Sequence, residues 1–84
     1  MIKIYTKTTC PYCVMAKAWL KENNYNYVEV LLDDDEQRMK FYEDHNITSR
    51  TVPQIYNNGA LIGGYNELVK SELAVKLDPT AEDF

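Results

Sequence analysis

Polar and apolar residues alternate at the start of the chain and then recur at a helical period. The first six residues, Met-Ile-Lys-Ile-Tyr-Thr, alternate and include β-branched side chains, which predicts a strand. Within residues 13–22, apolar side chains recur at intervals of three and four, at Cys13, Ala16, Trp19 and Leu20. This spacing predicts an amphipathic helix that follows the strand directly.

A second strand completes the first structural unit. Asn23-Asn24 supplies turn residues, and the apolar run Tyr27–Leu32 predicts the strand that follows. A strand, a helix and a strand in this order form a βαβ unit. We therefore expect the two strands to be parallel and the crossover to be right-handed.

Four consecutive carboxylates, Asp33-Asp34-Asp35-Glu36, precede the next helical segment. They lack the glycine and the terminal glutamate of a calcium-binding loop. Acidic residues at a helix start instead cap the helix and oppose its dipole. We expect a helix from about Asp34 to His45, with Met39 and Tyr42 as core contacts and His45 as a helix-terminus residue rather than a catalyst.

A β-hairpin is predicted next. Pro53–Asn57 is typical of a strand whose first residue is proline, where no ladder hydrogen bond is lost. Asn58-Gly59 is the strongest turn signal in the chain, and Ala60–Ile62 supplies the partner strand. Gly63-Gly64 permits close approach of the backbone to a neighbouring element or to a ligand.

The last predicted element is a helix from about Asn66 to Leu77. Asp78-Pro79 ends it, and residues 79–84 are expected to form a frayed tail of the single domain 1–84. Its buried stripe is expected to consist of Val69, Leu73 and Leu77.

Composition narrows the possible functions. The chain has 84 residues, 45% hydrophobic and 26% charged, as in an ordinary soluble domain. A net charge of -4 argues against nucleic-acid binding, which uses basic surfaces. No stretch approaches the roughly 18–20 apolar residues of a membrane span, and no secretory signal is visible. We therefore expect a cytoplasmic protein with no membrane partner.

The two cysteines, Cys10 and Cys13, are the only ones in the chain and carry its clearest chemical signal. Cys10 falls in the predicted turn between strand and helix, and Pro11 occupies the first helical position, where proline is well tolerated. Unpaired backbone N–H groups of the first helical turn, together with Lys7, would stabilise a thiolate at Cys10. Cys13 lies closer to the core. We expect Cys10 to be the nucleophile and Cys13 the resolving thiol.

Two plainer explanations of the cysteine pair are less favoured. A zinc site usually needs four ligands, and the chain adds only His45 to the two cysteines. A structural disulfide would close a loop of only about four residues and would constrain the unfolded chain little. Disulfides in the cytosol are usually transient and catalytic. A Cys-x-x-Cys beside a βαβ unit therefore favours redox chemistry.

Three motifs in order resemble the dithiol glutaredoxins: Lys-Thr-Thr-Cys-Pro-Tyr-Cys at residues 7–13, Thr51-Val52-Pro53, and Gly63-Gly64. The resemblance covers nearly the whole chain. It implies an α/β thioredoxin-like fold with a four-stranded mixed sheet, βαβ then β-hairpin, and three flanking helices. It also implies a thiol–disulfide oxidoreductase with glutathione as co-substrate, no tightly bound cofactor and no metal.

The resemblance assigns roles to individual residues. Cys10 would attack a glutathione-containing disulfide, Pro53 would be cis and face the cysteines, and the Val52 backbone would pair with the cysteinyl part of glutathione. Lys7 and Arg50 would hold the glycine carboxylate. The implied glutathione-binding set is Lys7, Tyr12, Arg50, Thr51, Val52, Pro53, Gly64, Asn66 and Glu67.

One position departs from the family pattern. After the glycine pair the family commonly has an acidic residue that accepts the ammonium group of glutathione, and this chain has Tyr65-Asn66-Glu67. Asn66 could accept a neutral hydrogen bond there, or Glu67 could supply the missing charge.

The implied partners are glutathione and disulfide-bearing or glutathionylated proteins, such as ribonucleotide reductase, acted on by a monomer. One alternative is a similar redoxin that takes electrons from thioredoxin reductase and serves ribonucleotide reductase. Another is an iron–sulfur carrier in which Cys10 and glutathione are the ligands in a dimer. Relatives of that kind mostly lack the Cys-Pro-Tyr-Cys sequence.

Overall fold

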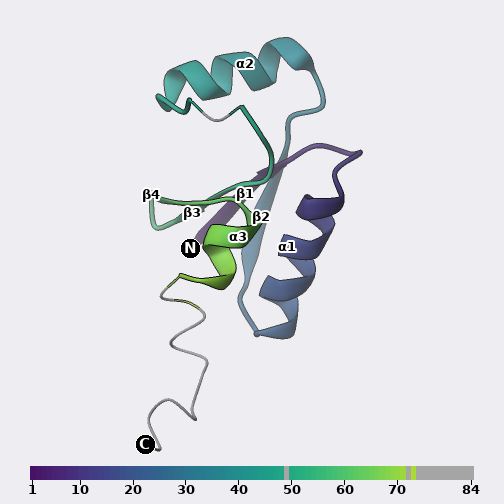
Figure 1. Cartoon of the computed structure of the whole chain (residues 1–84), viewed down its shortest axis with the longest axis vertical. Helices are drawn as coiled ribbons and strands as arrows, with labels where there is room; N and C mark the ends of the chain where they lie inside the picture. The colour runs from purple at the N-terminus through teal and green to yellow at the C-terminus, as the bar shows by residue number, and fades with distance from the viewer. Residues whose placement is uncertain (49, 72, 74–84) are drawn as a thin grey trace, which may run out of the picture.

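The computed structural model describes residues 1–48, 50–71 and 73, and every structural statement below refers to them. Strands and helices alternate through the first half of the chain, and a hairpin and a short helix follow (Figure 1). The elements are β1 (Ile2–Thr6), α1 (Pro11–Glu22), β2 (Tyr27–Leu31), α2 (Asp35–Asp44), β3 (Gln54–Asn57), β4 (Ala60–Gly63) and α3 (Tyr65–Val69).

The strands form one mixed sheet in the order β2-β1-β3-β4. β1 and β2 are parallel, as the βαβ unit predicted, and β3 is antiparallel to both β1 and β4. Asn58 and Gly59 form the hairpin turn with positive φ angles of 52° and 87°, which asparagine and glycine tolerate best. The predicted thioredoxin-like architecture of a βαβ unit followed by a hairpin is therefore confirmed.

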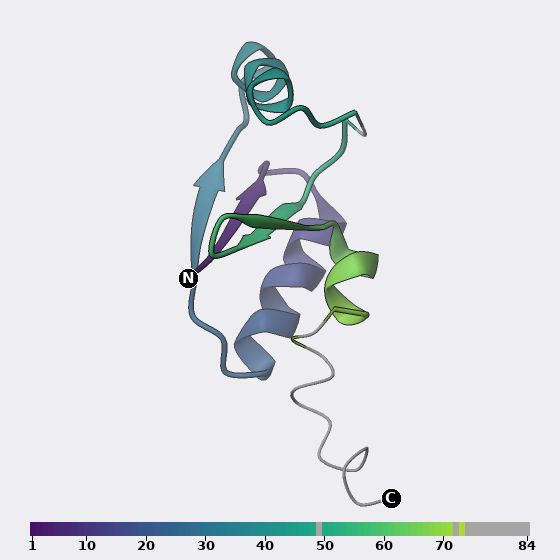
Figure 2. The same cartoon turned by 90° about the vertical axis from the view of Figure 1, so that its left-hand side faces the viewer.

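The helices cover the two faces of the sheet unequally. α1 and α3 lie side by side on one face, and α2 lies beyond the end of the sheet at which β2 finishes (Figures 1 and 2). The larger core forms between the sheet and the helices α1 and α3, and its buried residues are Ile2, Ile4, Ala16, Leu20, Ile55, Leu68 and Leu73. A smaller cluster of Leu32, Phe41 and Tyr42 joins α2 to the rest of the molecule.

Two sequence predictions of buried residues need correction. Met39 was expected in the core but is 38% exposed, because α2 turns Phe41, on the side of the helix opposite Met39, inward together with Tyr42. In α3 the fully buried residue is Leu68, and Val69 is only half-buried. Leu73 is buried as predicted. The predicted end of this helix, with Leu77 and the tail 79–84, lies outside the described residues.

Within the described ranges, no helix is long and apolar enough to cross a lipid bilayer.

Candidate active site

Cys10 and Cys13 are joined by a disulfide at the start of α1, with their Cα atoms 5.2 Å apart. Cys10 is the N-cap residue of α1 in an extended conformation, and Pro11 occupies the first turn. The backbone N–H of Cys13 donates to Cys10 Sγ over 3.1 Å. Cys10 is 8% exposed and Cys13 only 1%, so Cys10 is the more exposed of two largely buried cysteines. The predicted position of the pair is thus confirmed.

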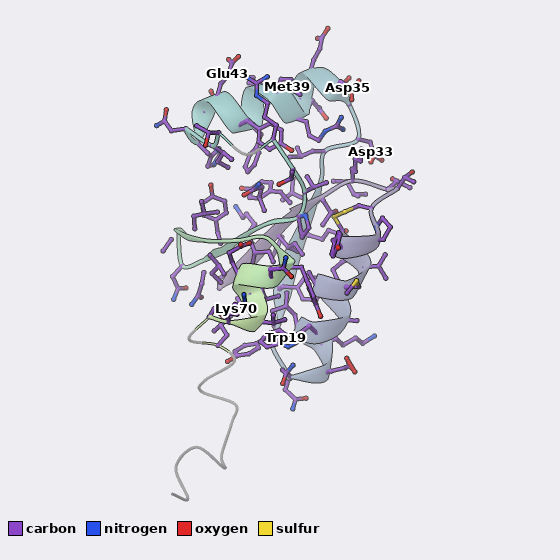
Figure 3. The ribbon with its side chains drawn as sticks, viewed as in Figure 1. Trp19, Asp33, Asp35, Met39, Glu43 and Lys70 are labelled. Atoms are coloured by element: carbon purple, nitrogen blue, oxygen red, sulfur yellow. A yellow bond between two sulfur atoms is a disulfide. The ribbon has the colours of Figure 1, made fainter. Side chains whose placement is uncertain are left out.

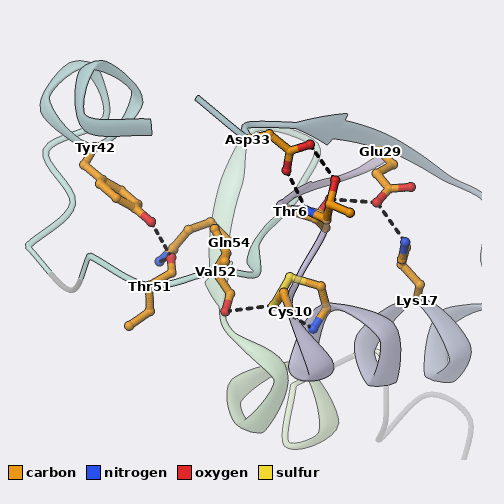
Figure 4. Close-up of a disulfide and its surroundings, with 11 residues drawn as sticks. Thr6, Cys10, Lys17, Glu29, Asp33, Tyr42, Thr51, Val52 and Gln54 are labelled. Atoms are coloured by element: carbon orange, nitrogen blue, oxygen red, sulfur yellow. Dashed lines mark hydrogen bonds and ion pairs between the residues drawn. A yellow bond between two sulfur atoms is a disulfide. The ribbon is translucent and has the colours of Figure 1, made fainter. Parts of the chain in front are cut away.

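A second segment approaches the disulfide from the sheet. The Val52–Pro53 peptide bond is cis, as the resemblance implied, and the carbonyl oxygen of Val52 lies 3.6 Å from Cys10 Sγ (Figure 4). Two donors hold the preceding carbonyl of Thr51: Tyr42 Oη at 3.0 Å and Gln54 Nε2 at 2.8 Å. Burial raises the pKa of Tyr42, so its hydroxyl keeps the donated proton at neutral pH. A helix and a strand therefore fix the backbone beside the sulfur.

Two cavities flank this meeting point and share Thr51 and Val52. The first has a volume of about 310 Å³ and is lined by Tyr12, Thr51, Val52, Pro53, Gly64, Tyr65, Asn66 and Glu67. The second has a volume of about 320 Å³ and is lined by Lys7, Thr9, Cys10, Pro11, Arg38, Met39, Tyr42, Arg50, Thr51 and Val52. All the residues of the implied glutathione-binding set line one cavity or the other.

The second cavity has a cationic wall. Lys7 and Arg50 line it, as does Arg38, which the sequence analysis did not single out. Arg38 donates to the carbonyl oxygens of Leu32 at 2.8 Å and Asp33 at 3.1 Å and pairs with Asp35, so its guanidinium holds the β2–α2 connection. Arg38 lies within a helical segment rich in charged residues, where sequence spacing does not distinguish a cavity lining from a solvated face.

The first cavity ends at the start of α3. Gly64 N–H donates to Glu67 Oε1 over 2.8 Å, so the Glu67 carboxylate caps this helix. Gly63 has φ of 125°, and a Cβ built there would lie 2.8 Å from Glu67 Cγ, so the turn requires glycine. The close approach that Gly63-Gly64 permits is therefore made to a neighbouring side chain. Asn66 is exposed in the cavity wall.

Tyr65 lines the first cavity and, like Arg38, was not assigned to the site from the sequence. Its ring lies 6.2 Å from that of Tyr12, centroid to centroid, so two aromatic rings from α3 and α1 border the first cavity. The signal available in the sequence was its place directly after the glycine pair.

Two carboxylates brace the elements around Cys10. Asp33 accepts the backbone N–H of Thr8 over 2.6 Å and also the Thr8 hydroxyl, and these bonds lower the pKa of Asp33. Glu29 accepts from Lys17 at 2.8 Å and from Thr6 at 2.7 Å, which lowers the pKa of Glu29 (Figure 4). These contacts tie β2 to β1, to α1 and to the loop before the cysteines.

Comparisons with known proteins agree with this geometry. The glutaredoxin family model matches residues 2–62. The chain belongs to the glutaredoxin family. A probable glutaredoxin of Synechocystis is 36% identical over 78 residues, covering 93% of this chain and 72% of that protein. Glutaredoxin 1 of Rickettsia conorii is 36% identical over 84 residues, covering 98% of this chain and 81% of that protein.

The fold of this glutaredoxin is also found among solved structures. The crystal structure of glutaredoxin 1 from Francisella tularensis, complexed with cacodylate, matches with a TM-score of 0.79 at 41% identity. The match covers 92% of this chain and 96% of that one. Family, fold and the Cys10–Cys13 pair together identify a thiol–disulfide oxidoreductase. In the part of the chain that the structure describes, no three side chains of His, Cys, Asp or Glu cluster to hold a metal ion.

Proposed function

We propose that this glutaredoxin is glutathione-dependent and reduces protein disulfides and glutathione mixed disulfides. The observation that carries the proposal is the pair of cavities that meet at Val52 beside Cys10 Sγ. Glutathione is a short peptide with carboxylates at both ends and a sulfur in the middle. A groove with cations at one end and a capped helix start at the other, with Cys10 in the lining of its cationic part, suits that shape.

In the first step, the Cys10 thiolate attacks the glutathione sulfur of a mixed disulfide. The bond between that sulfur and the target thiol breaks, and the target leaves as a thiolate that takes up a proton. The N–H of Cys13, which lies 3.1 Å from Cys10 Sγ, stabilises negative charge on this sulfur. Cys10 is then linked to glutathione.

Two routes resolve this intermediate. A second glutathione thiolate can attack the bound glutathione sulfur, which releases glutathione disulfide and regenerates the Cys10 thiolate. Alternatively, Cys13 attacks Cys10, releases glutathione and forms the Cys10–Cys13 disulfide present in the structure. Reduction of a protein disulfide needs both thiols, because the protein remains attached to Cys10 until Cys13 displaces it.

Several residues are assigned by this proposal. Lys7 and Arg50 bind the glycine carboxylate, the Val52 backbone pairs with the cysteinyl part, and the γ-glutamyl end lies near Gly64 and Asn66. Their places along the two cavities support these roles. Ribonucleotide reductase as a target, the monomeric state and the cytoplasmic location stay predictions of the sequence.

A comparison of electron donors tests the proposal. The oxidised protein is mixed either with glutathione, glutathione reductase and NADPH, or with thioredoxin reductase and NADPH, and NADPH consumption is followed. We expect rapid reduction by glutathione only. Reduction by thioredoxin reductase alone would overturn the proposal and favour the redoxin alternative.

A further inference from the structure

Met39 is not part of the core, although its position in the sequence suggested that it would be. Its thioether lies instead in the wall of the cavity beside Cys10. Met39 lies on α2 (Figure 3). It is 38% exposed and lines the cationic cavity together with Cys10 and Lys7. Its Sδ atom is 3.7 Å from Nη1 of Arg50. An oxidisable sulfur thus contacts a guanidinium that the proposed function assigns to a glutathione carboxylate.

We propose that Met39 is an oxidation site that weakens glutathione binding when it is converted to the sulfoxide. The inference rests on the proposed glutathione-dependent function. The oxidant is a hydroperoxide. A lone pair of the Met39 sulfur attacks one peroxide oxygen, an S–O bond forms and the O–O bond breaks. The sulfur is oxidised by two electrons, and the peroxide is reduced to water or an alcohol after proton transfer.

The consequence follows from the contact with Arg50. A thioether is a weak hydrogen-bond acceptor, and the guanidinium keeps its donors available to a stronger one. A sulfoxide oxygen is polar and carries partial negative charge. It competes for the Arg50 donors and places a partial negative charge in a cavity that is proposed to receive a carboxylate. Lys7 is unaffected, so binding is weakened rather than abolished.

The chain contains a matched control. Met15 on α1 is 43% exposed, so a soluble peroxide reaches it as readily as it reaches Met39. Met15 is absent from the linings of both cavities beside Cys10. Oxidation of Met15 therefore leaves the carboxylate-binding side of the groove unaltered.

The experiment uses the whole chain in its disulfide form, in which the two cysteine sulfurs are bonded to each other rather than free as thiolates. The protein is treated with hydrogen peroxide, the peroxide is removed, and conversion at Met39 and Met15 is measured by peptide mass mapping. Dithiothreitol then reduces the disulfide. The Michaelis constant for a small glutathione mixed disulfide is compared with that of the untreated protein, for the unmodified chain and for Met39→Leu, Met39→Ile and Met15→Leu.

We expect treatment to raise the Michaelis constant roughly three- to tenfold in the unmodified chain and in Met15→Leu, as for the partial loss of a charge-assisted hydrogen bond. Treatment should leave it unchanged in the two Met39 variants, each measured against its own untreated form. In Arg50→Gln the increase on treatment should be smaller, because the guanidinium with which the sulfoxide interacts is missing.

An unchanged constant after full conversion of Met39 would overturn the inference and leave the proposed function standing. An equal rise in the Met39 variants would also overturn it, because the effect would then come from another residue. If the untreated chain does not use glutathione mixed disulfides, the proposed function itself fails, and the inference fails with it.

Discussion

The two cysteines are three residues apart, yet their surroundings differ in ways that bear on reactivity. Cys10 caps α1 and accepts the Cys13 N–H at 3.1 Å, whereas Cys13 is almost completely buried. A sulfur with an N–H donor aimed at it is stabilised as a thiolate, and burial in apolar surroundings disfavours one.

We predict that iodoacetamide below neutral pH alkylates Cys10 first in the reduced protein, and peptide mapping after short exposure measures this.

The two cysteines should also differ when each is replaced. Cys13→Ser should retain turnover of glutathione mixed disulfides and lose reduction of protein disulfides, while Cys10→Ser should lose both activities. Equal labelling of the two cysteines, or a Cys13→Ser variant without either activity, would contradict the assigned roles.

A second prediction concerns the exposed Asn66 in the first cavity. Asn66→Asp adds a carboxylate where the ammonium group of glutathione is proposed to bind. A hydrogen bond to a charged group contributes about 1 kcal/mol more binding free energy than a neutral one. We therefore expect the Michaelis constant for glutathione to fall roughly fivefold. The gain should shrink with added salt.

The neighbouring Glu67 carboxylate caps α3 by accepting the Gly64 N–H at 2.8 Å, and it is also a candidate to bind the ammonium group of glutathione. Glu67→Gln separates these two roles. Glutamine keeps an oxygen acceptor for that bond but removes the charge. A weaker affinity for glutathione in Glu67→Gln, with no gain from Asn66→Asp, would assign the ammonium contact to Glu67. Unchanged kinetics in both variants would exclude this end of the groove from ammonium binding.

At the scale of elements, the loop between β1 and α1 is held by Asp33, whose carboxylate accepts two hydrogen bonds from Thr8. These bonds lower the pKa of Asp33 below its unfolded value. The stability they contribute is therefore present above the unfolded pKa of about 3.9 and is lost as the pH falls through the lower, folded value.

We predict that Asp33→Asn lowers the free energy of unfolding at pH 7 and that the difference from the unmodified protein narrows towards pH 3. Urea unfolding at several pH values measures it. Asp34→Asn is the matched control, because the Asp34 side chain makes no cap hydrogen bond. An equal loss in both variants, or a loss independent of pH, would rule out the Thr8 contact as the cause.

The elements themselves could be predicted wherever a local signal exists. The Asn58-Gly59 turn, the βαβ unit and the cysteines at the start of α1 follow from short-range rules, and the structure has them there. The contact between Thr8 and Asp33 has no such signal, because it joins two loops that only the parallel pairing of β1 and β2 brings together.

The less accurate predictions concern which side of a helix is buried. On α2, Met39 and Tyr42 share a helical face, but Phe41 and Tyr42 are the buried pair. On α3, Leu68 is buried in place of its neighbour Val69. Helical spacing selects a stripe, and the orientation of the helix against the rest of the molecule then decides which residues beside that stripe are buried. That orientation also exposes Met39 to the cavity beside Cys10.

At the scale of the whole molecule, stability depends chiefly on the core between the sheet and the helices α1 and α3. Leu20 and Ile55 are both fully buried there. We predict that Leu20→Ala lowers the free energy of unfolding by about 2–5 kcal/mol, the cost of lost burial and of the cavity that remains.

Val14→Ala on the exposed side of the same helix is the control, and it should change the free energy of unfolding by less than about 0.5 kcal/mol. Urea denaturation of both variants in the disulfide form provides the comparison. Similar losses at the two positions would mean that α1 does not pack against the sheet as described.

The antiparallel pairing of β1 with β3 places Tyr5 opposite Gln54, near the points where Cys10 follows one strand and Val52 precedes the other. The register of these two strands thus helps to set the distance between Cys10 and Val52. Displacing one strand by a single residue moves its end by about 3.4 Å and turns its side chains to the opposite face. A slip of that size is about as large as the 3.6 Å between sulfur and carbonyl, so it would disrupt their contact. Chain length within these two strands is therefore constrained by chemistry, whereas length in the Asn58-Gly59 turn is constrained only by folding.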